Sequence, residues 1–382
     1  MIIRKLLLTL VLFPSSIGFA SESSLSLNLT KGVTNISGQV YDLHMMILYI
    51  CIVIGIVVFG AMLWVIIYHR KSRGAVAANF HESTKVEVIW TLIPIVILVG
   101  MAIPASRVLL AMEDTSEPDI TVQVTGSQWK WHYRYFDQDI NYFSLLASSP
   151  AQIYGKHKKR ENYLLEVDRP LVLPIGKKIR FLITSEDVIH SWWVPAFAVK
   201  KDANPGFINE AWTKIDKPGI YRGQCAELCG KAHGFMPIVV IAKSSEEFDV
   251  WVKETVSVQA RIREEEQKSL GIDMGMNELM ALGEEVYKSH CSGCHQVNGL
   301  GLSSMFPALA NSDIVVNPDR LMDHLNIVIF GKEGTAMQAF GSQLGLKELA
   351  AVITYERNAW GNNTNDTIQI ADINAILKGS GL

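Results

Sequence analysis

The pattern of hydrophobic and polar positions divides the chain into segments of different character. Apolar residues run almost unbroken from about Leu43 to Tyr68 and from about Val88 to Met112. Each run is long enough for a helix to cross a hydrocarbon core about 30 Å thick. A buried hairpin of a soluble protein is the alternative, but the length of both runs favours a pair of transmembrane helices.

Beyond the second run, short segments rich in Val, Ile and aromatic residues alternate with Gly and Pro. Several short strands broken by turn signals predict an antiparallel sandwich or barrel. The candidate strands are Ile120–Val124, Trp129–Phe136, Leu164–Val167, Lys178–Thr184, Phe207–Ile215, Gly219–Gln224 and Pro237–Ile241.

The last third of the chain has the periodicity of helices. A charged stretch from Glu246 to Leu270 predicts a solvated helix that links two domains. Helical patterns then recur around Glu278–Ser289, Asp319–Phe330 and Leu346–Ala359. These patterns predict a compact all-α domain at the C-terminal end.

Charged residues near the N-terminus predict where each segment lies. Arg4 and Lys5 precede an apolar stretch and small residues that end at Ala20, which is the layout of a secretory signal peptide. The loop between the two apolar runs is rich in positive charge and is therefore expected on the cytoplasmic side, with everything after Met112 outside. The predicted division is a signal peptide at 1–20, an N-terminal segment with two transmembrane helices at 21–112, a β domain at 113–245, a linker helix at 246–276 and an α-helical domain at 277–382.

Composition narrows the classes of function. A formal net charge of −3 argues against a nucleic-acid partner, and a hydrophobic content of 49% agrees with membrane segments. The 5 cysteines are too few for a disulfide scaffold, and four of them form two tight pairs beside histidines, which favours metal or haem chemistry. The remaining cysteine, Cys51, lies within an apolar run and is expected to be a packed thiol.

The first cysteine pair belongs to a set of soft ligands. Thiolate, imidazole and thioether suit copper, and such a set on a β-sandwich is the cupredoxin arrangement. Two cysteines four residues apart can direct both sulfurs to one place and bridge two copper ions, so that one shared electron changes each bond length little. The predicted donors are Cys225, Cys229, His190, His233, Met236 and the carbonyl of Glu227. A disulfide between the two cysteines and a zinc site are the alternatives.

The second pair lies in the sequence Cys291-Ser-Gly-Cys294-His295. This spacing is how haem c is attached, with two thioether bonds and an adjacent histidine as axial ligand. A zinc knuckle or a thioredoxin-like pair does not need the histidine.

The sixth iron ligand is expected further along the chain. Met337 lies in a glycine-bounded loop between helix candidates and is the preferred ligand. Met305 is too near the attachment loop to reach the opposite haem face, and Met322 is expected in the core.

The copper-loop residues carry a specific resemblance. The segment Gln224–Gly230 with His233 and Met236, preceded by His190–Pro195, resembles subunit II of the haem–copper cytochrome c oxidases over roughly residues 40–245. The resemblance implies a binuclear CuA centre with the donors given above. It also implies that the Glu227 side chain helps to hold a magnesium ion shared with the catalytic subunit, and that Glu87 lies near the mouth of a proton channel. An interfacial, solvated carboxylate is the alternative for Glu87.

The segment Gly126–Trp131 resembles the aromatic patch of the same family. In that patch the first tryptophan, here Trp129, receives electrons from cytochrome c; core packing is the alternative. Lys130 stands where the family usually has an aromatic residue, and Ser127 where it usually has a histidine. These departures leave the details of donor docking open.

The C-terminal segment resembles a class I cytochrome c domain, in which a methionine at the position of Met337 completes the iron coordination. The whole chain therefore resembles subunit II of the caa3-type oxidases: a transmembrane hairpin, a cupredoxin-like domain and an all-α cytochrome c domain. The implied path runs from an external c-type cytochrome to haem c, then to CuA, then to the catalytic subunit that reduces oxygen with proton pumping. The implied partners are the catalytic subunit I, subunit III and the lipid of a bacterial-type inner membrane.

The chain carries no helix-borne set of histidines for an oxygen-reducing site, so it is expected to be an electron-input subunit rather than a complete oxidase. A membrane-tethered redox carrier or sensor that works without an oxidase is the alternative function. A copper-delivery protein is a third possibility, disfavoured because delivery sites are exposed and exchangeable.

Overall fold

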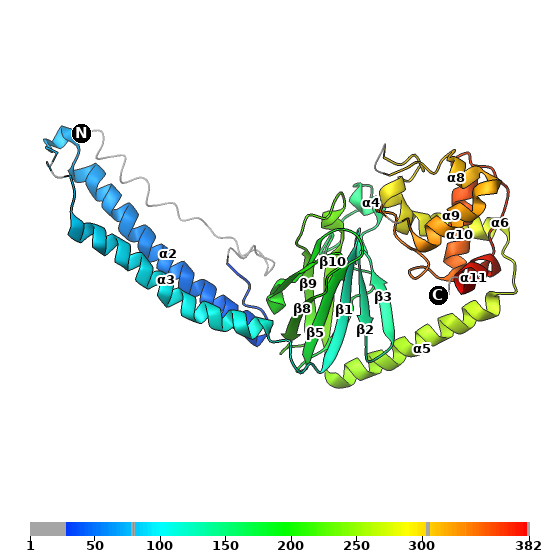
Figure 1. The fold of residues 1–382 in the computed structure, drawn as a ribbon, viewed down its shortest axis with the longest axis horizontal. Helices are drawn as coiled ribbons and strands as arrows, with labels where there is room; N and C mark the ends of the chain where they lie inside the picture. Colours follow the sequence, from blue (N-terminus) through cyan, green and yellow to red (C-terminus); the bar gives the residue numbers. More distant parts are fainter. Residues whose placement is uncertain (1–27, 78, 80, 303–305, 333, 380–382) are drawn as a thin grey trace.

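The computed structural model describes residues 28–77, 79, 81–302, 306–332 and 334–379. The segment predicted as a signal peptide lies outside the described residues. A helical hairpin, a β-sandwich and an α-helical domain follow one another along the chain, and a long helix runs below the sandwich to the last domain (Figure 1).

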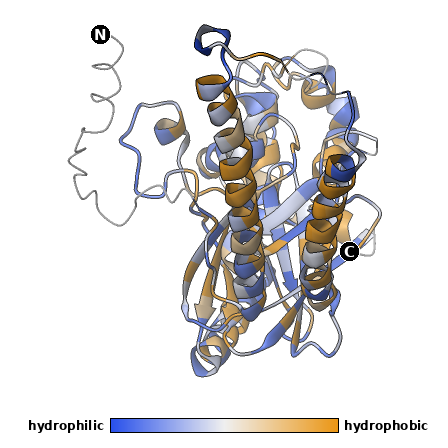
Figure 2. Cartoon of the chain, turned by 90° about the vertical axis from the view of Figure 1, so that its left-hand side faces the viewer, coloured by the Kyte–Doolittle hydropathy of each residue, from blue (hydrophilic) through white to orange (hydrophobic). Residues whose placement is uncertain are grey.

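The two apolar runs form the helices α2 (Asn35–Tyr68) and α3 (Thr84–Glu113). Their most apolar windows have mean hydropathies of 3.0 and 2.4, and none of either window is buried within the chain. Figure 2 shows both helices in front, with long hydrophobic surfaces. The prediction of two membrane-spanning helices is confirmed. Cys51 is exposed on α2, so the expectation that its thiol packs inside this chain is wrong: no residue among those described in the hairpin covers it.

The outer end of the hairpin is tied to the β domain. Trp212 Nε1 donates a hydrogen bond to the carbonyl of Ala111 at 3.0 Å. Lys201 Nζ pairs with a carboxylate oxygen of Glu113 at 3.2 Å. These contacts join the end of α3 directly to two strands, so the sandwich is held against the membrane anchor.

The β domain is a sandwich of two five-stranded sheets, in the orders β3-β2-β1-β5-β8 and β4-β10-β9-β6-β7. Tyr133, Phe181 and Trp192 are fully buried between the sheets, because alternate residues of each strand face inward. The strands are β1 (Ile120–Ser127), β2 (Lys130–Tyr135), β3 (Ile140–Ser144), β4 (Leu171–Pro174), β5 (Lys178–Ser185), β6 (His190–Val194), β7 (Val199–Ala203), β8 (Asn209–Lys214), β9 (Gly219–Cys225) and β10 (Pro237–Lys243).

Four of these strands were not predicted: β3, β4, β6 and β7. The predicted strand at Leu164–Val167 is wrong, since that segment contributes only an isolated bridge between Val167 and Leu146. The short helix α4 (Pro150–Ile153) lies in the same irregular region.

The linker helix is α5 (Ser245–Ser269), and it begins at Ser244 with a capping box that includes Glu247. Its first turns pack on the sandwich, where the Trp251 ring centroid lies 5.5 Å from that of Tyr135. The remaining turns are charged and exposed, as predicted for a solvated connection.

The last domain is built around the crossing of two helices. Gly283 lies on the first of these helices (Met276–Val286) and Ala351 on the second (Leu346–Asn358). A Cβ at Gly283 would be 2.2 Å from the carbonyl oxygen of Ala351, so the two helix backbones approach closely. Its helices are α6 (Met276–Val286), a π-helical turn at Tyr287–Cys291, α7 (Ser292–His295), α8 (Asp313–Val316), α9 (Leu321–Phe330), α10 (Leu346–Asn358) and α11 (Ile370–Gly379). The all-α fold class is confirmed, and α11 adds a helix that the sequence pattern missed.

Two methionine predictions concern this domain. Met322 is 53% exposed in the first turn of α9, so its predicted place in the core is wrong. The buried part of α9 begins two residues later, at His324. Met305 lies outside the described residues.

Candidate metal and haem centres

The predicted copper donors meet at one end of the second sheet. His190 is the first residue of β6, Cys225 is the last residue of β9, and Met236 directly precedes β10. Cys229 and His233 lie in the loop that connects β9 to β10. The ladder between β9 and β10 fixes the two ends of this loop. The pairing of β6 with β9 brings His190 to it from 35 positions before Cys225.

The donor atoms lie within a few ångströms of one another. The two sulfurs of Cys225 and Cys229 are 3.8 Å apart and unbonded, which removes the disulfide alternative. His190 Nδ1 lies 4.0 Å from Cys225 Sγ, and His233 Nδ1 lies 3.5 Å from Cys229 Sγ. Met236 Sδ lies 3.6 Å from Cys229 Sγ.

The carbonyl oxygen of Glu227 completes the set at 3.3 Å from Cys225 Sγ. The donors thus comprise two thiols, two imidazoles, one thioether and one carbonyl oxygen, arranged around a pair of sulfurs. Soft sulfur donors with imidazole suit copper, whereas a zinc site needs neither the thioether nor the carbonyl. The donor chemistry therefore fits copper.

The two thiols cannot both lose their protons without a cation. A hydrogen bond from Cys229 lowers the pKa of Cys225 well below its usual range, although burial opposes this. The same bond and burial raise the pKa of Cys229 above its usual range. Adjacent thiolates repel, so the second proton leaves only when positive charge arrives. The pair is therefore suited to binding a positively charged metal ion.

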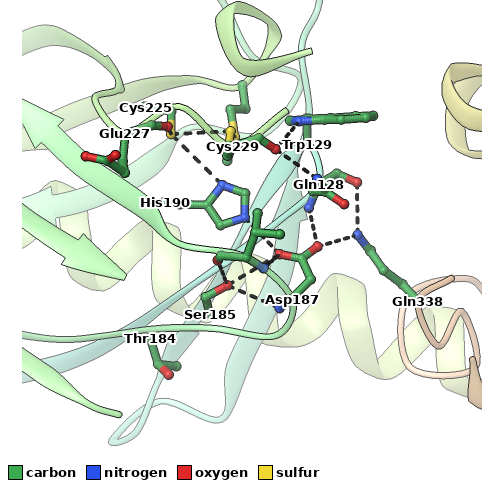
Figure 3. A network of polar contacts seen from close by, with 12 residues as sticks. Gln128, Trp129, Thr184, Ser185, Asp187, His190, Cys225, Glu227, Cys229 and Gln338 are labelled. Atoms are coloured by element: carbon green, nitrogen blue, oxygen red, sulfur yellow. Dashed lines mark hydrogen bonds and ion pairs between the residues drawn. The ribbon is translucent and has the colours of Figure 1, made fainter. Parts of the chain in front are cut away.

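Asp187 orients the histidine from the side opposite the sulfurs (Figure 3). One of its carboxylate oxygens lies 2.9 Å from His190 Nε2. That contact leaves Nδ1 of His190 facing Cys225 as a ligand atom. Gly126 on β1 makes room for the ring, since a Cβ there would lie 3.0 Å from the His190 side chain. Asp187, three positions before His190, was not among the residues predicted from the sequence.

Trp129 and Gln128 contact the copper loop from the other sheet. Trp129 Nε1 donates to the carbonyl of Cys229 at 3.1 Å, and Gln128 Nε2 donates to the same carbonyl at 2.8 Å. Trp129 is half-buried. The structure therefore brings the predicted tryptophan into direct contact with the candidate copper site, and adds Gln128, which the sequence pattern did not single out.

The haem-attachment residues lie together in the last domain. Cys291 and His295 are buried and Cys294 is half-buried. His295 Nδ1 lies 2.8 Å from the carbonyl oxygen of Pro307, an acceptor, so Nδ1 carries the proton and Nε2 is left to bind a metal. This geometry fits an axial histidine of haem c.

Met337 is partly buried against the hydrophobic core that includes Cys291. The backbone N–H of Lys332 donates to the carbonyl of Met337 at 2.9 Å, which closes the loop on itself. Gly331 permits this closure, with a positive φ of 76°. The predicted sixth ligand Met337 therefore packs against the core of the haem domain.

The side chains of the two predicted acidic residues are both exposed. Glu227 belongs to the copper loop, and its carboxylate is exposed. Glu87 lies in the first turn of α3, where its carboxylate accepts a hydrogen bond from Ser83 N at 3.4 Å. The helix dipole stabilises a carboxylate near a helix N-terminus whatever its function. The contact of Glu87 with Ser83 therefore agrees equally with a proton-channel residue and with an interfacial carboxylate.

Comparison with known proteins places these parts in a family. Residues 120–243 match the family model for the periplasmic domain of cytochrome c oxidase subunit II, and residues 22–108 match its transmembrane domain. Residues 278–355 match the model for cytochrome c oxidase, cbb3-type, subunit III.

Individual relatives agree with the family models. A probable cytochrome c oxidase subunit 2 of Rickettsia bellii is 42% identical, over 66% of this chain and 93% of that protein. Cytochrome c oxidase subunit 2 of Cereibacter sphaeroides is 37% identical, over 57% of this chain and 77% of that protein. The crystal structure of the periplasmic domain of Bradyrhizobium japonicum oxidase subunit II (CoxB) is 41% identical, over 37% of this chain and 97% of that chain, with a TM-score of 0.34.

Proposed function

Because this chain belongs to the cytochrome c oxidase subunit II family, we propose that its two centres are a binuclear CuA site and a covalently bound haem c acting in series. The chain is the electron-input subunit of a haem–copper oxidase, with two helices in the inner membrane and its other domains in the periplasm. Its domains imply copper and haem as cofactors, and other oxidase subunits and cytochrome c as partners.

The convergence of the donor atoms carries the copper assignment. We assign Cys225 and Cys229 as bridging thiolates, because their sulfurs lie 3.8 Å apart with further donors on both sides. The end ligands are His190, His233, Met236 and the Glu227 carbonyl. Copper supplies the one-electron chemistry of such a site, and the protein supplies a rigid set of donors that stay in place when the charge changes.

The haem assignment follows from the second cysteine pair. Cys291 and Cys294 would form the thioether bonds, with His295 and Met337 as the axial ligands. The hydrogen bond of His295 to Pro307 supports this role, because it fixes the ring with Nε2 free.

The remaining proposed site residues serve electron uptake, magnesium binding and proton transfer. We assign Trp129 to electron uptake from a donor, supported by its bond to the Cys229 carbonyl. Glu227 would share a magnesium ion with catalytic subunit I, and Glu87 would lie at a proton channel. Subunit III and a c-type cytochrome are the other proposed partners. The proposed division of the chain is a signal peptide at 1–20, an N-terminal segment with two transmembrane helices at 21–112, a cupredoxin-like domain at 113–245, a linker helix at 246–276 and a cytochrome c domain at 277–382.

The test is electron paramagnetic resonance with optical spectroscopy on the purified, membrane-extracted protein. We expect hyperfine structure from one electron shared by two coppers, together with a low-spin c haem that remains attached on denaturation. Cys229→Ser should abolish the shared-electron signal and leave the haem spectrum unchanged. A wild-type spectrum with intact haem but one copper or none would instead favour a tethered electron carrier.

A further inference from the structure

Lys130 is a buried cation at the contact between the sandwich and the haem domain. It is 5% exposed, at the start of β2. Its Nζ lies 5.3 Å from the ring centroid of Phe143 on β3 and 4.9 Å from that of Phe340 in the haem domain. It also donates a hydrogen bond to the side-chain oxygen of Gln343 in the haem domain. Lys130 therefore contacts both domains at once.

A buried ammonium needs such partners. Removing a charge from water is costly unless rings, dipoles or opposite charges replace the hydration. Here the replacement comes from two aromatic faces and one amide oxygen, and two of these three partners belong to the haem domain. Burial lowers the pKa of Lys130 to about 8, against the attraction of Glu186. An aromatic residue at this position could stack on Phe143 but would lack the positive charge that the Phe143 and Phe340 rings and the Gln343 side-chain oxygen surround here.

Gln338 makes the second contact between the domains, directly after Met337 in the sequence. Its Nε2 donates to the carbonyl of Gln128 at 2.9 Å and to a carboxylate oxygen of Asp187 at 3.2 Å (Figure 3). The other oxygen of Asp187 contacts His190 Nε2 at 2.9 Å. One peptide unit and two hydrogen bonds thus connect the Met337 loop with a copper ligand.

We propose that Lys130 and Gln338 dock the haem domain on the copper domain as a fixed electron donor, with Gln338 as the positioning residue that connects the Met337 loop to His190 through Asp187. This inference rests on the proposed function of the two centres. It gives a role to Lys130, which departs from the family's aromatic patch, and to Gln338, which no motif contains.

The electron balance of the step is simple. One electron leaves the ferrous haem, which becomes ferric, and the oxidised copper centre is reduced by one electron. No bond forms or breaks, and no further reactant is needed. Since α5 tethers the two domains, docking is intramolecular and replaces diffusional encounter with a high effective concentration.

The experiment uses the intact oxidase with Lys130→Met and Gln338→Ala, each alone and combined. Two quantities are measured: hydrogen–deuterium exchange of residues 336–344, and the rate of electron transfer from haem c to copper after rapid photoreduction. The loss of a hydrogen bond to a charged group should weaken docking about tenfold or more. We expect faster exchange in both variants, slower electron transfer, and unchanged copper resonance and haem absorbance. Lys130→Arg, which keeps the cation, should restore much of the protection.

Lys214→Met is the matched control, because Lys214 is an exposed lysine on β8, at the far edge of the same sheet. If Lys130→Met does not assemble, Gln338→Ala with Gln343→Ala tests the same contact from the haem domain. Exchange and transfer rates equal to those of the control, with both spectra intact, would overturn the dock. A wild type without the shared-copper signal or without attached haem would instead overturn the proposed function.

Discussion

Replacing Asp187 by Asn removes one acceptor oxygen from behind His190, the proposed copper ligand. The carboxylate accepts on both oxygens: Oδ1 lies 2.9 Å from His190 Nε2 and 2.7 Å from Val188 N, and Oδ2 lies 2.8 Å from Gln128 N. These contacts keep the pKa of Asp187 below its usual value although burial opposes them. The side chain is only 8% exposed, so water cannot easily replace a lost acceptor. An asparagine amide therefore turns its NH2 group toward one of these donors.

The size of the effect follows from those contacts. A hydrogen bond to a charged group contributes about 1.5–3 kcal/mol, and 1.4 kcal/mol corresponds to a factor of ten in affinity. We therefore expect Asp187→Asn to weaken copper retention by about 10- to 100-fold, the range known for residues that orient metal ligands.

The assay is a chelator titration of the purified protein, followed by the copper resonance with haem absorbance as the internal reference. Asp216→Asn, at an exposed position on the same domain, is the control. Equal copper retention in the two variants would refute the orienting role of Asp187.

Three further substitutions test other parts of the chain. Met337→Ala should leave the haem attached but change its low-spin spectrum and potential, because the proposed sixth ligand is lost; an unchanged spectrum contradicts the assignment. Glu87→Gln should slow proton-linked turnover while copper reduction keeps its wild-type rate, and normal turnover would make Glu87 an ordinary interfacial carboxylate. Gly283→Ala should lower the unfolding free energy of the haem domain by about 1–3 kcal/mol, since the new Cβ would lie 2.2 Å from the Ala351 carbonyl. Denaturant midpoints measure this, with Gly271→Ala as the control because its Cβ would meet no atom within 4 Å; matching midpoints would argue against the close helix crossing.

The copper donors were predictable because their chemistry is local. Cys225 and Cys229 lie four positions apart, and His190 begins a strand that contains Trp192 and Trp193, so residue type and spacing were enough to single them out. The strands that carry them were less visible. β6 begins with the polar pair His190 and Ser191, and β7 contains the sequence Lys200-Lys201-Asp202. Polar residues at such positions hide the alternation on which strand prediction depends, and charged edge strands are common because they discourage edge-to-edge pairing.

The contact between the two redox domains could not be predicted in this way. Lys130 and Gln343 are 213 positions apart, and Gln338 and Asp187 are 151 positions apart. No local periodicity connects such pairs, because they meet only after two separate domains have folded and α5 has set their separation. The sequence offered one indirect signal, a lysine in place of an aromatic residue, and its meaning depended on the partner that buries it.

The contacts between the domains of this chain favour fixed domain positions over association by diffusion. The end of α3 is bonded to β8 through Ala111 and Trp212, and the start of α5 packs on Tyr135. The Met337 loop is joined to the opposite end of the sandwich through Gln338. The copper domain is thus held at three places, toward the membrane, toward the linker and toward the haem domain. With both redox domains positioned in advance, binding energy is not spent on association at each transfer. Flexible elements are then needed only where an external donor must arrive and leave.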